Sequence, residues 1–202
     1  EDDLTDLLLD MKSLIFPWIR LNRIVRDIPA DYIICSSEKS NLRQEMTDIL
    51  KVEGKRCNCI RCREVKEQEW DGNYHLYIRK YDGSNGTEYF ISAESYDATT
   101  LYGFLRLRIP PPQQSSTPTT TWQFPELKNS ALLRELHVYG TIQKVVDGKQ
   151  SDHVQHKGLG KILVQKAISI IKTRHPRMHG LAVIAAEGTR GYYEKLGFQD
   201  IP

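Results

Sequence analysis

The chain has 202 residues, which allows one large domain or two small ones with a buried core. Its apolar and charged fractions, 40% and 27%, are ordinary for a globular protein, and no apolar run reaches the roughly 18 residues of a membrane span. The net charge of +2 excludes a strong overall field for nucleic acid, and the acidic start is not a signal peptide. We therefore expect a cytoplasmic protein with no membrane partner.

The first third of the chain is expected to contain two helices. Residues 3–16 carry apolar side chains at helical spacing, and Pro17 ends that helix. A second helix is expected over 41–52, with a short strand over 31–36 before it. The apolar side of the first helix is expected to consist of Leu4, Leu7, Leu8, Met11, Leu14 and Ile15.

Basic residues gather in the same part of the chain. Arg20, Arg23 and Arg26 recur at every third position, and residues 11–66 hold twelve Lys and Arg against seven Asp and Glu, net +5. These arginines could bind phosphates. A solvated face with Asp27 and Asp31 as partners is the alternative.

Three of the four cysteines, Cys57, Cys59 and Cys62, lie within six residues. Thiolates are soft ligands that suit zinc, and a Cys-x-Cys-x-x-Cys turn can present three of them to one ion. We expect a metal-binding linker over 55–69, with Cys35 as the candidate fourth ligand. A histidine or a residue outside the chain could replace Cys35. The alternative is three reduced cysteines without metal. Four nearby cations would lower the thiol pKa values and suit a phosphate backbone. They are Lys55, Arg56, Arg61 and Arg63.

The middle of the chain predicts a β-sheet. Residues 73–81 and 87–92 are expected to form a hairpin across 82–86, followed by strands over 101–109 and 132–139. Two polar segments, 110–121 and 143–154, are expected to be loops.

A glycine-rich segment, 155–160, then opens an apolar helical repeat that ends before Pro176. Because Gly158 and Gly160 have no Cβ, the backbone there can approach a ligand closely. The free N–H groups and the dipole of a helix start can bind a diphosphate without a metal. An ordinary glycine-rich helix start is the alternative. Beyond it, residues 181–186 predict a buried strand and 188–198 a last helix that ends in Gly-Phe.

These elements follow one another as they do in the GNAT acyl-CoA N-acetyltransferases. The glycine segment matches the family pattern Gln/Arg-x-x-Gly-x-Gly/Ala, and Tyr193 lies four residues before Gly197, as a tyrosine of that family does. The resemblance implies an α/β protein with a GNAT fold over 70–202, a mixed sheet flanked by helices, and acetyl-CoA as cofactor. The cofactor-binding residues that it implies are Leu136, His137, Val138, Gln155, His156, Lys157, Gly158, Leu159, Gly160, Lys161 and Tyr193.

Four residues are candidates for catalysis by the same resemblance. Tyr193 is the candidate donor of a proton to the CoA sulfur, since a phenol of pKa about 10 suits a thiolate of similar basicity, and Tyr192 flanks it. Alternatively, both tyrosines pack, or contact the tRNA that a second resemblance, to the catalytic subunit of Elongator, implies. Glu135 and His137 project from one strand face, and either could relay a proton or form a satisfied polar pair.

Residues 134–140, 155–160 and 188–193 also resemble the catalytic subunit of Elongator, and 18–29, 41–43 and 61–65 resemble the stretch that precedes its acetyltransferase domain. This resemblance makes residues 1–54 the tail of a radical-SAM barrel. The chain lacks the Cys-x-x-x-Cys-x-x-Cys loop, so S-adenosylmethionine and a 4Fe-4S cluster are expected only in a full-length protein.

The function implied is a tRNA-dependent acetyl-CoA acetyltransferase that contributes to carboxymethyl modification at C5 of wobble uridine 34. Its expected partners are tRNA and either other Elongator subunits or a second copy of the chain. The alternatives are a protein lysine N-acetyltransferase of histone type and a non-catalytic tRNA-binding scaffold. The tRNA-binding residues implied are Arg20, Arg23, Arg26, Lys55, Arg56, Arg61 and Arg63.

Overall fold

The structure is a computed structural model that describes residues 2–22, 24, 42–66, 72–111, 127–139 and 158–201. The chain divides into two compact units, Glu1–Glu64 and Val65–Pro202. The strand predicted over 31–36 and most of the two predicted polar loops lie outside the described residues. Within the described part, no helix has the length and apolar character needed to cross a membrane.

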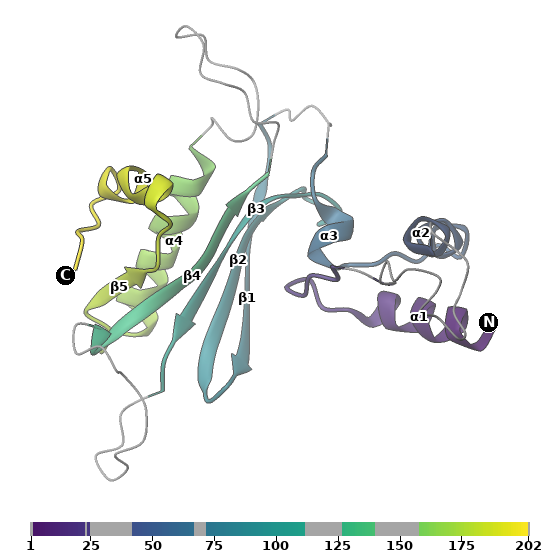
Figure 1. Cartoon of the computed structure of the whole chain (residues 1–202), viewed down its shortest axis with the longest axis horizontal. Coiled ribbons are helices and arrows are strands. Elements are labelled where there is room, and N and C mark those ends of the chain that lie inside the picture. The colour runs from purple at the N-terminus through teal and green to yellow at the C-terminus, as the bar shows by residue number, and fades with distance from the viewer. Residues whose placement is uncertain are drawn as a thin grey trace, which may run out of the picture. The chain divides into compact units, whose positions relative to one another are not determined.

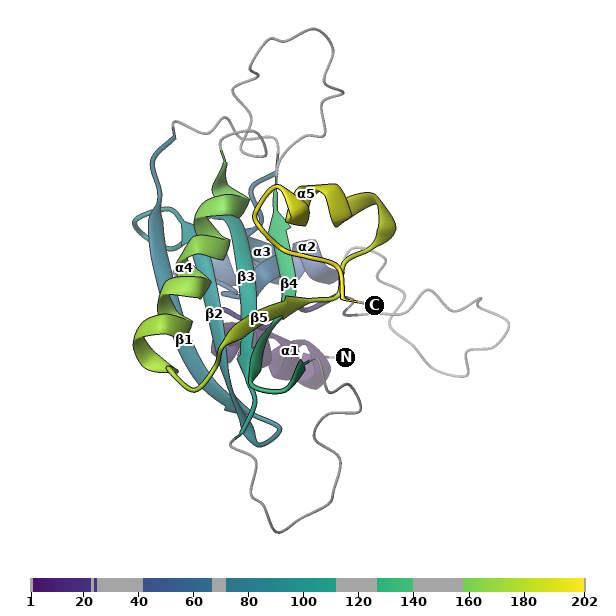
Figure 2. The same cartoon turned by 90° about the vertical axis from the view of Figure 1, so that its left-hand side faces the viewer.

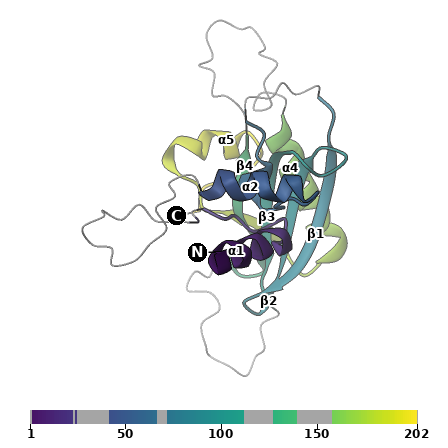
Figure 3. The ribbon, with the colours of Figure 1, turned by 90° about the vertical axis from the view of Figure 1, so that its right-hand side faces the viewer.

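The first unit is helical, as predicted. It contains α1 (Asp2–Leu14), α2 (Leu42–Val52) and the single turn α3 (Ile60–Arg63), and α1 packs against α2 (Figures 1 and 3). Every fourth residue of α2, namely Leu42, Met46 and Leu50, is buried. Leu50 forms a small core with Cys57 and Cys59, against which Leu9, Ile15, Leu21 and Cys62 pack.

The side of α1 that faces inward differs from the prediction. Four members of the expected apolar side are 48–78% exposed, whereas Lys12 is 1% exposed. The helix therefore turns the face that carries Lys12, rather than its leucine stripe, toward the rest of the unit. The exposed members are Leu4, Leu7, Met11 and Leu14.

The second unit is built on a five-stranded sheet whose strands follow the order of the chain (Figure 2). The first four strands are antiparallel and the fifth runs parallel to the fourth. The predicted hairpin is confirmed: Gly83 pairs with Gly86, and Ser84 and Asn85 turn the chain at φ of 45° and 61°. The strands are β1 (His75–Gly83), β2 (Gly86–Glu94), β3 (Leu101–Ile109), β4 (Ser130–Val138) and β5 (Gly180–Val183).

Helix α4 (Leu159–Arg174) lies across one face of the sheet, over β2, β3 and β4 (Figure 2). Its buried residues recur at three- and four-residue intervals, which is the spacing of one helical face. The helix ends before Pro176, as the sequence predicted. The buried residues are Leu159, Gly160, Leu163, Val164, Ala167, Ile170 and Ile171.

The end of the chain departs from two predictions. The prediction of a buried strand over 181–186 is wrong in both extent and burial. Strand β5 ends at Val183, its residues are half-buried, and Ile184 is 97% exposed. Among the described residues β5 pairs only with β4, so it is an edge strand. The helix predicted over 188–198 is shorter, because it consists of the turn η4 (Glu187–Thr189) and α5 (Arg190–Glu194).

Candidate functional site

The two parallel strands of the sheet separate partway along their length. The pairing of β4 with β5 covers only Ser130–Leu133, while β4 continues to Val138. Beyond Leu133, the side of β4 that faces away from β3 therefore has no described strand beside it. Such a separation exposes strand backbone to which an extended ligand can hydrogen-bond.

The beginning of α4 is shaped by a glycine. Gly158 caps the helix with a left-handed backbone, φ 73°, and a Cβ at this position would meet no atom within 4 Å. Because glycine has no side chain, the cap residue accepts no hydrogen bond from the first N–H groups of the helix through a side chain. Gln155, His156 and Lys157 lie outside the described residues, and Lys161 is exposed on the first turn.

Gly160 joins three elements. A Cβ built on it would collide with the Tyr192 hydroxyl of α5 and would lie 3.7 Å from Cγ2 of Val138 at the end of β4. The start of α4, the end of β4 and α5 therefore meet at one point, and a side chain at position 160 would fit only if the Tyr192 side chain moved. This convergence brings together three of the predicted site segments.

A second close approach lies behind the same point. A Cβ on Gly103 of β3 would lie 2.9 Å from the His137 carbonyl oxygen, 3.3 Å from Val138 Cα and 3.4 Å from a Leu159 methyl. Gly103 thus lets β3, β4 and α4 pack closely. Sequence reasoning missed this residue; a glycine inside an apolar strand was the available indication.

The two tyrosines point to different places. Tyr192 is 41% exposed and its hydroxyl lies at Gly160, whereas Tyr193 stacks edge-on against Phe198 at 5.4 Å between ring centroids. Burial raises the pKa of Tyr192, and burial followed by repulsion from Tyr192 raises the pKa of Tyr193. Both phenols are therefore held as proton donors at neutral pH.

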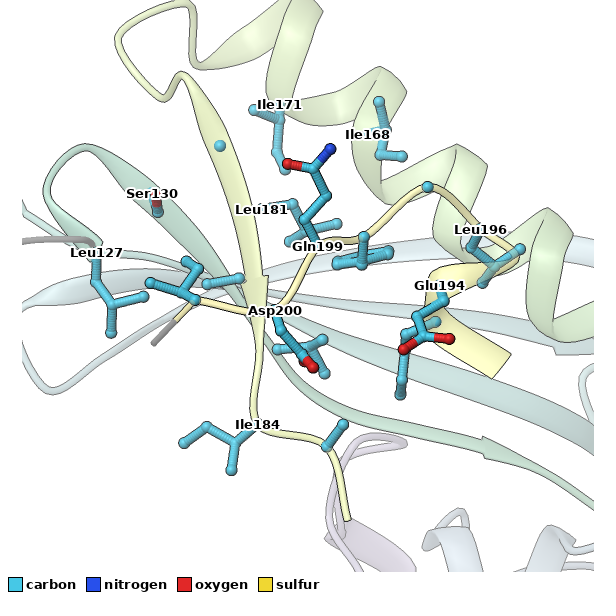
Figure 4. Close-up of a pocket in the computed structure, with 18 of the residues that line it drawn as sticks. Leu127, Ser130, Ile168, Ile171, Leu181, Ile184, Glu194, Leu196, Gln199 and Asp200 are labelled. Carbon is cyan, nitrogen blue, oxygen red and sulfur yellow. The ribbon is translucent and has the colours of Figure 1, made fainter. Parts of the chain in front are cut away.

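Tyr193 lines a cavity with a volume of about 850 Å³. Its walls include residues of α4, β5, α5 and the segment that follows α5, among them Ile168, Leu181 and Leu196 (Figure 4). The lining includes neither Gly160 nor Tyr192. This cavity is therefore distinct from the place where α4, β4 and α5 converge.

Glu135 and His137 lie on the opposite face of the sheet from α4. Glu135 pairs with Arg106 in register and its Oε2 accepts a hydrogen bond from Arg106 Nε at 2.9 Å. His137 is exposed and lies over Phe104 and Tyr139, with ring centroids 6.0 Å and 4.3 Å away. The two side chains share a face as the strand alternation predicts. The Glu135 side chain is 42% exposed, and its ion-pair partner is Arg106 rather than His137.

The same face carries further ion pairs that sequence reasoning missed. Glu88 is 2% exposed and accepts hydrogen bonds from Arg108 at 2.7 Å and Arg134 at 2.8 Å. Glu94 is fully buried and binds Arg79 at 2.6 Å. The alternation of arginines with apolar residues along β3 was the only indication of this row in the sequence.

The cysteine turn gathers three sulfur atoms. The Sγ atoms of Cys57, Cys59 and Cys62 all lie within 4.8 Å of one another, and Cys57 and Cys59 are buried. The turn is fixed by a bond from Cys62 N–H to the Cys59 carbonyl at 3.1 Å. Hydrogen bonds with Cys57 and Cys62 lower the pKa of Cys59, while the bond with Cys59 raises the pKa of Cys57.

The donor set fits a zinc ion. Zinc–sulfur bonds of about 2.3 Å in tetrahedral geometry require sulfur atoms roughly 3.8 Å apart, so a small inward shift suffices. Cys35, the candidate fourth ligand, lies outside the described residues. Two cations approach one of the sulfurs, with Lys12 Nζ at 4.0 Å and Arg43 Nη1 at 3.9 Å from Cys62 Sγ.

The predicted tRNA-binding residues differ in their surroundings. Arg20 pairs with Glu64 at 2.8 Å, Arg61 approaches the same carboxylate at 3.8 Å, and Lys55 binds Glu53 at 2.9 Å. The hydrogen bond and charge of Glu53 raise the pKa of Lys55. Arg56 is exposed, and Arg23 and Arg26 lie outside the described residues.

Arg63 is a special case among these cations. It is 3% exposed and donates hydrogen bonds to the carbonyls of Asn58 and Pro17, both at 2.8 Å. Its guanidinium therefore fixes the turn around the cysteines and is not presented to a phosphate. The burial of Arg63 could not be predicted from the sequence, because nothing distinguishes a buried arginine from an exposed one within a run of basic residues.

Comparisons with known proteins agree with the Elongator resemblance. No protein-family model matches the chain. A tRNA uridine(34) acetyltransferase of Dehalococcoides mccartyi is 38% identical over an alignment that covers 97% of this chain and 42% of that protein. Elongator complex protein 3 of Dictyostelium discoideum is 37% identical over 98% of this chain and 35% of its own length.

A solved structure gives the same result. The archaeal Methanocaldococcus infernus Elp3 with an N-terminal deletion superposes with a TM-score of 0.75 and 31% identity, over 98% of this chain and 46% of that one. The chain thus spans less than half the length of each of these relatives. Over nearly all of its residues, therefore, the chain is a homologue of part of proteins named tRNA uridine(34) acetyltransferase and Elongator complex protein 3.

Proposed function

We propose that this chain acts in a tRNA-dependent acetyl-CoA acetyltransferase that contributes to carboxymethyl modification at C5 of wobble uridine 34, in the cytoplasm. In this proposal residues 70–202 have the GNAT fold and residues 1–54 are the tail of a radical-SAM domain. The observation that supports it best is the meeting of Gly160, Val138 and Tyr192 at the start of α4. The similarity to tRNA uridine(34) acetyltransferases supports the choice of tRNA as substrate.

The start of α4 is proposed to hold the pyrophosphate of acetyl-CoA. The N–H groups of Leu159, Gly160 and Lys161 lie in the first helical turn, where they and the helix dipole favour an anion. Gln155, His156, Lys157 and Gly158 complete the loop in this proposal. The pantetheine arm would extend along β4 at Leu136, His137 and Val138, where β5 has already separated.

Acetyl-CoA supplies the acetyl group as a thioester. When water, as the acceptor, attacks its carbonyl carbon, the carbon–sulfur bond breaks, acetate forms, and a tyrosine phenol gives its proton to the departing thiolate. Joining the methyl carbon to C5 of the uridine would require the radical chemistry proposed for the longer protein. Tyr193 or Tyr192 serves as this donor. The proton that the acceptor loses passes to Glu135 or His137 on the other face of the sheet.

The cysteine turn is proposed to hold one zinc ion. Cys57, Cys59 and Cys62 supply three thiolates and Cys35 the fourth, which would close the site and make it structural rather than catalytic. S-adenosylmethionine and a 4Fe-4S cluster belong to a longer protein in this proposal.

The proposed partners are tRNA and either other Elongator subunits or a second copy of the chain. The cations offered to tRNA are Arg20, Arg23, Arg26, Lys55, Arg56 and Arg61. Arg63 is left out because it is buried against backbone carbonyls.

The release of CoA from acetyl-CoA tests the proposal. We expect release to increase when tRNA is added and to stay at its basal rate with a histone peptide. Stimulation by the peptide instead would favour the protein lysine acetyltransferase. Binding of tRNA without any CoA release would favour the non-catalytic scaffold.

A further inference from the structure

One buried lysine has no role in the proposed function. Lys12 lies in α1 and is 1% exposed. Among the described residues its ammonium group makes no ion pair with a carboxylate, and its hydrogen-bond partner is Cys62 Sγ, 4.0 Å away. Leu9 in α1 and Ile15, the residue after its end, pack against the core that contains Cys57 and Cys59.

A buried ammonium group requires a compensating negative charge. Desolvation of an isolated cation is unfavourable, so buried lysines are almost always paired. Three neutral thiols would not supply that charge. Three thiolates around a divalent ion would, because the complex carries a net negative charge that the neighbouring cations can neutralise.

The hydrogen bonds around Cys62 also favour a negative charge at the cysteines. Arg43 donates to Cys62 Sγ at 3.9 Å while its other nitrogen donates to the Leu21 carbonyl at 2.8 Å, which holds the guanidinium in place. Two cations thus converge on one sulfur. Partners that hydrogen-bond a metal ligand from outside fix its orientation and tune the metal.

We propose that Lys12 is a positioning residue for a metal-bound Cys62 thiolate. Its ammonium group donates an N–H···S hydrogen bond and neutralises part of the charge of the metal–thiolate complex. In return, the complex provides the negative charge that allows Lys12 to be buried. Metal binding therefore fixes α1 to the cysteine turn. The inference rests on the metal site of the proposed function but assigns a role to a residue outside the ligand set.

Spectroscopy of the cobalt-substituted chain tests the hydrogen bond. A Lys12→Met variant keeps an unbranched side chain that is one atom shorter and removes the hydrogen-bond donors. Because a thiolate that loses a hydrogen bond becomes a better electron donor, we expect its sulfur-to-cobalt charge-transfer band to move to longer wavelength. We also expect zinc affinity to fall about tenfold, which is the lower end for loss of such an outer partner.

Two variants serve as matched controls. Lys51→Met removes the same charge from an exposed site on α2, and Leu9→Ala loosens the packing of α1 against the cysteine core without removing a hydrogen-bond donor to a sulfur. Both should keep the wild-type band. The same band position in Lys12→Met and wild type, or an equal shift in Leu9→Ala, would overturn the inference. If the wild type takes up neither cobalt nor zinc, the proposed metal site fails as well.

A second measurement uses only the wild-type chain, in case Lys12→Met does not fold. Hydrogen exchange is followed before and after a chelator removes the metal. The backbone amides of α1 should lose protection, because metal loss leaves Lys12 buried without a counter-charge, while α4 in the other unit stays protected. Unchanged protection of α1 would contradict the proposed coupling.

Discussion

Replacing Gly160 with alanine tests the convergence of α4, β4 and α5. The new Cβ collides with the Tyr192 hydroxyl, which lies at the end of a side chain that can move, and not with the backbone. The substitution should therefore displace Tyr192 while leaving the fold intact.

The expected stability change is small because two effects oppose each other. Alanine is about 1 kcal/mol better than glycine inside a helix. Tyr192 is 41% exposed, and moving its whole ring into water would cost roughly 3 kcal/mol, so a shift of its hydroxyl end costs about 1 kcal/mol. We expect the melting temperature to change by less than about 4 °C.

The effect on turnover should be larger. Misplacement of a catalytic group by about 1 Å can lower a rate about 100-fold, so we expect acetyl-CoA turnover to fall between about 10- and 100-fold. Turnover is measured as CoA release with tRNA present. Gly191→Ala is the matched control, since it lies beside Tyr192 in α5 and its Cβ would meet no atom within 4 Å. Wild-type turnover and affinity in a folded Gly160→Ala protein would refute the reasoning.

Four further outcomes are expected. In Gly103→Ala the Cβ meets backbone of β4 that cannot yield, so the chain should lose about 1–3 kcal/mol of stability in urea unfolding, and an unchanged midpoint would show that β3 and β4 are not so tightly packed. Burial raises the pKa of Tyr192 and Tyr193 above the ordinary value of 10.0, so the phenols keep their protons as pH rises and turnover should decline only above pH 10. Comparing Tyr192→Phe with Tyr193→Phe identifies the phenol that produces the decline. A decline of wild-type turnover near pH 8 would exclude both phenols as the donor. Purified chain should contain about one zinc by elemental analysis, and a Cys57, Cys59 and Cys62 triple serine variant should contain none; equal metal content in the two proteins would place the metal elsewhere. Replacing Arg23 and Arg26 should weaken tRNA binding and reduce its salt dependence by about one unit of log–log slope per contact, whereas equal affinity at two salt concentrations would make these arginines surface solvation.

The sequence predicted the elements of the second unit well, because each depends on local patterns. The hairpin at Ser84 and Asn85 and the helix that begins at Leu159 follow from turn residues and apolar spacing. The short β5 was not predicted, since the apolar run through Ile184 looks like a buried strand, and burial depends on which neighbours are present.

Contacts between residues far apart in the chain could not be predicted from the sequence. Nothing in it shows that Tyr192 meets Gly160, that Gly103 lies behind Val138, or that Lys12 is buried beside Cys62. Each of these depends on packing between elements far apart in the chain. A glycine or a charged residue inside an apolar segment was the only local indication, and neither residue type identifies the partner that it meets in the folded chain.

Calorimetric titration of acetyl-CoA tests the central claim most directly, because it asks whether the start of α4 binds the cofactor. A Gly160→Glu side chain would bring a negative charge to the first turn of α4, where it repels the proposed pyrophosphate, and its Cβ would displace Tyr192, whereas Gly191→Glu adds the same charge where a Cβ meets nothing. The account predicts that the wild type and Gly191→Glu bind acetyl-CoA and that Gly160→Glu does not. Equal affinity in all three proteins would contradict it.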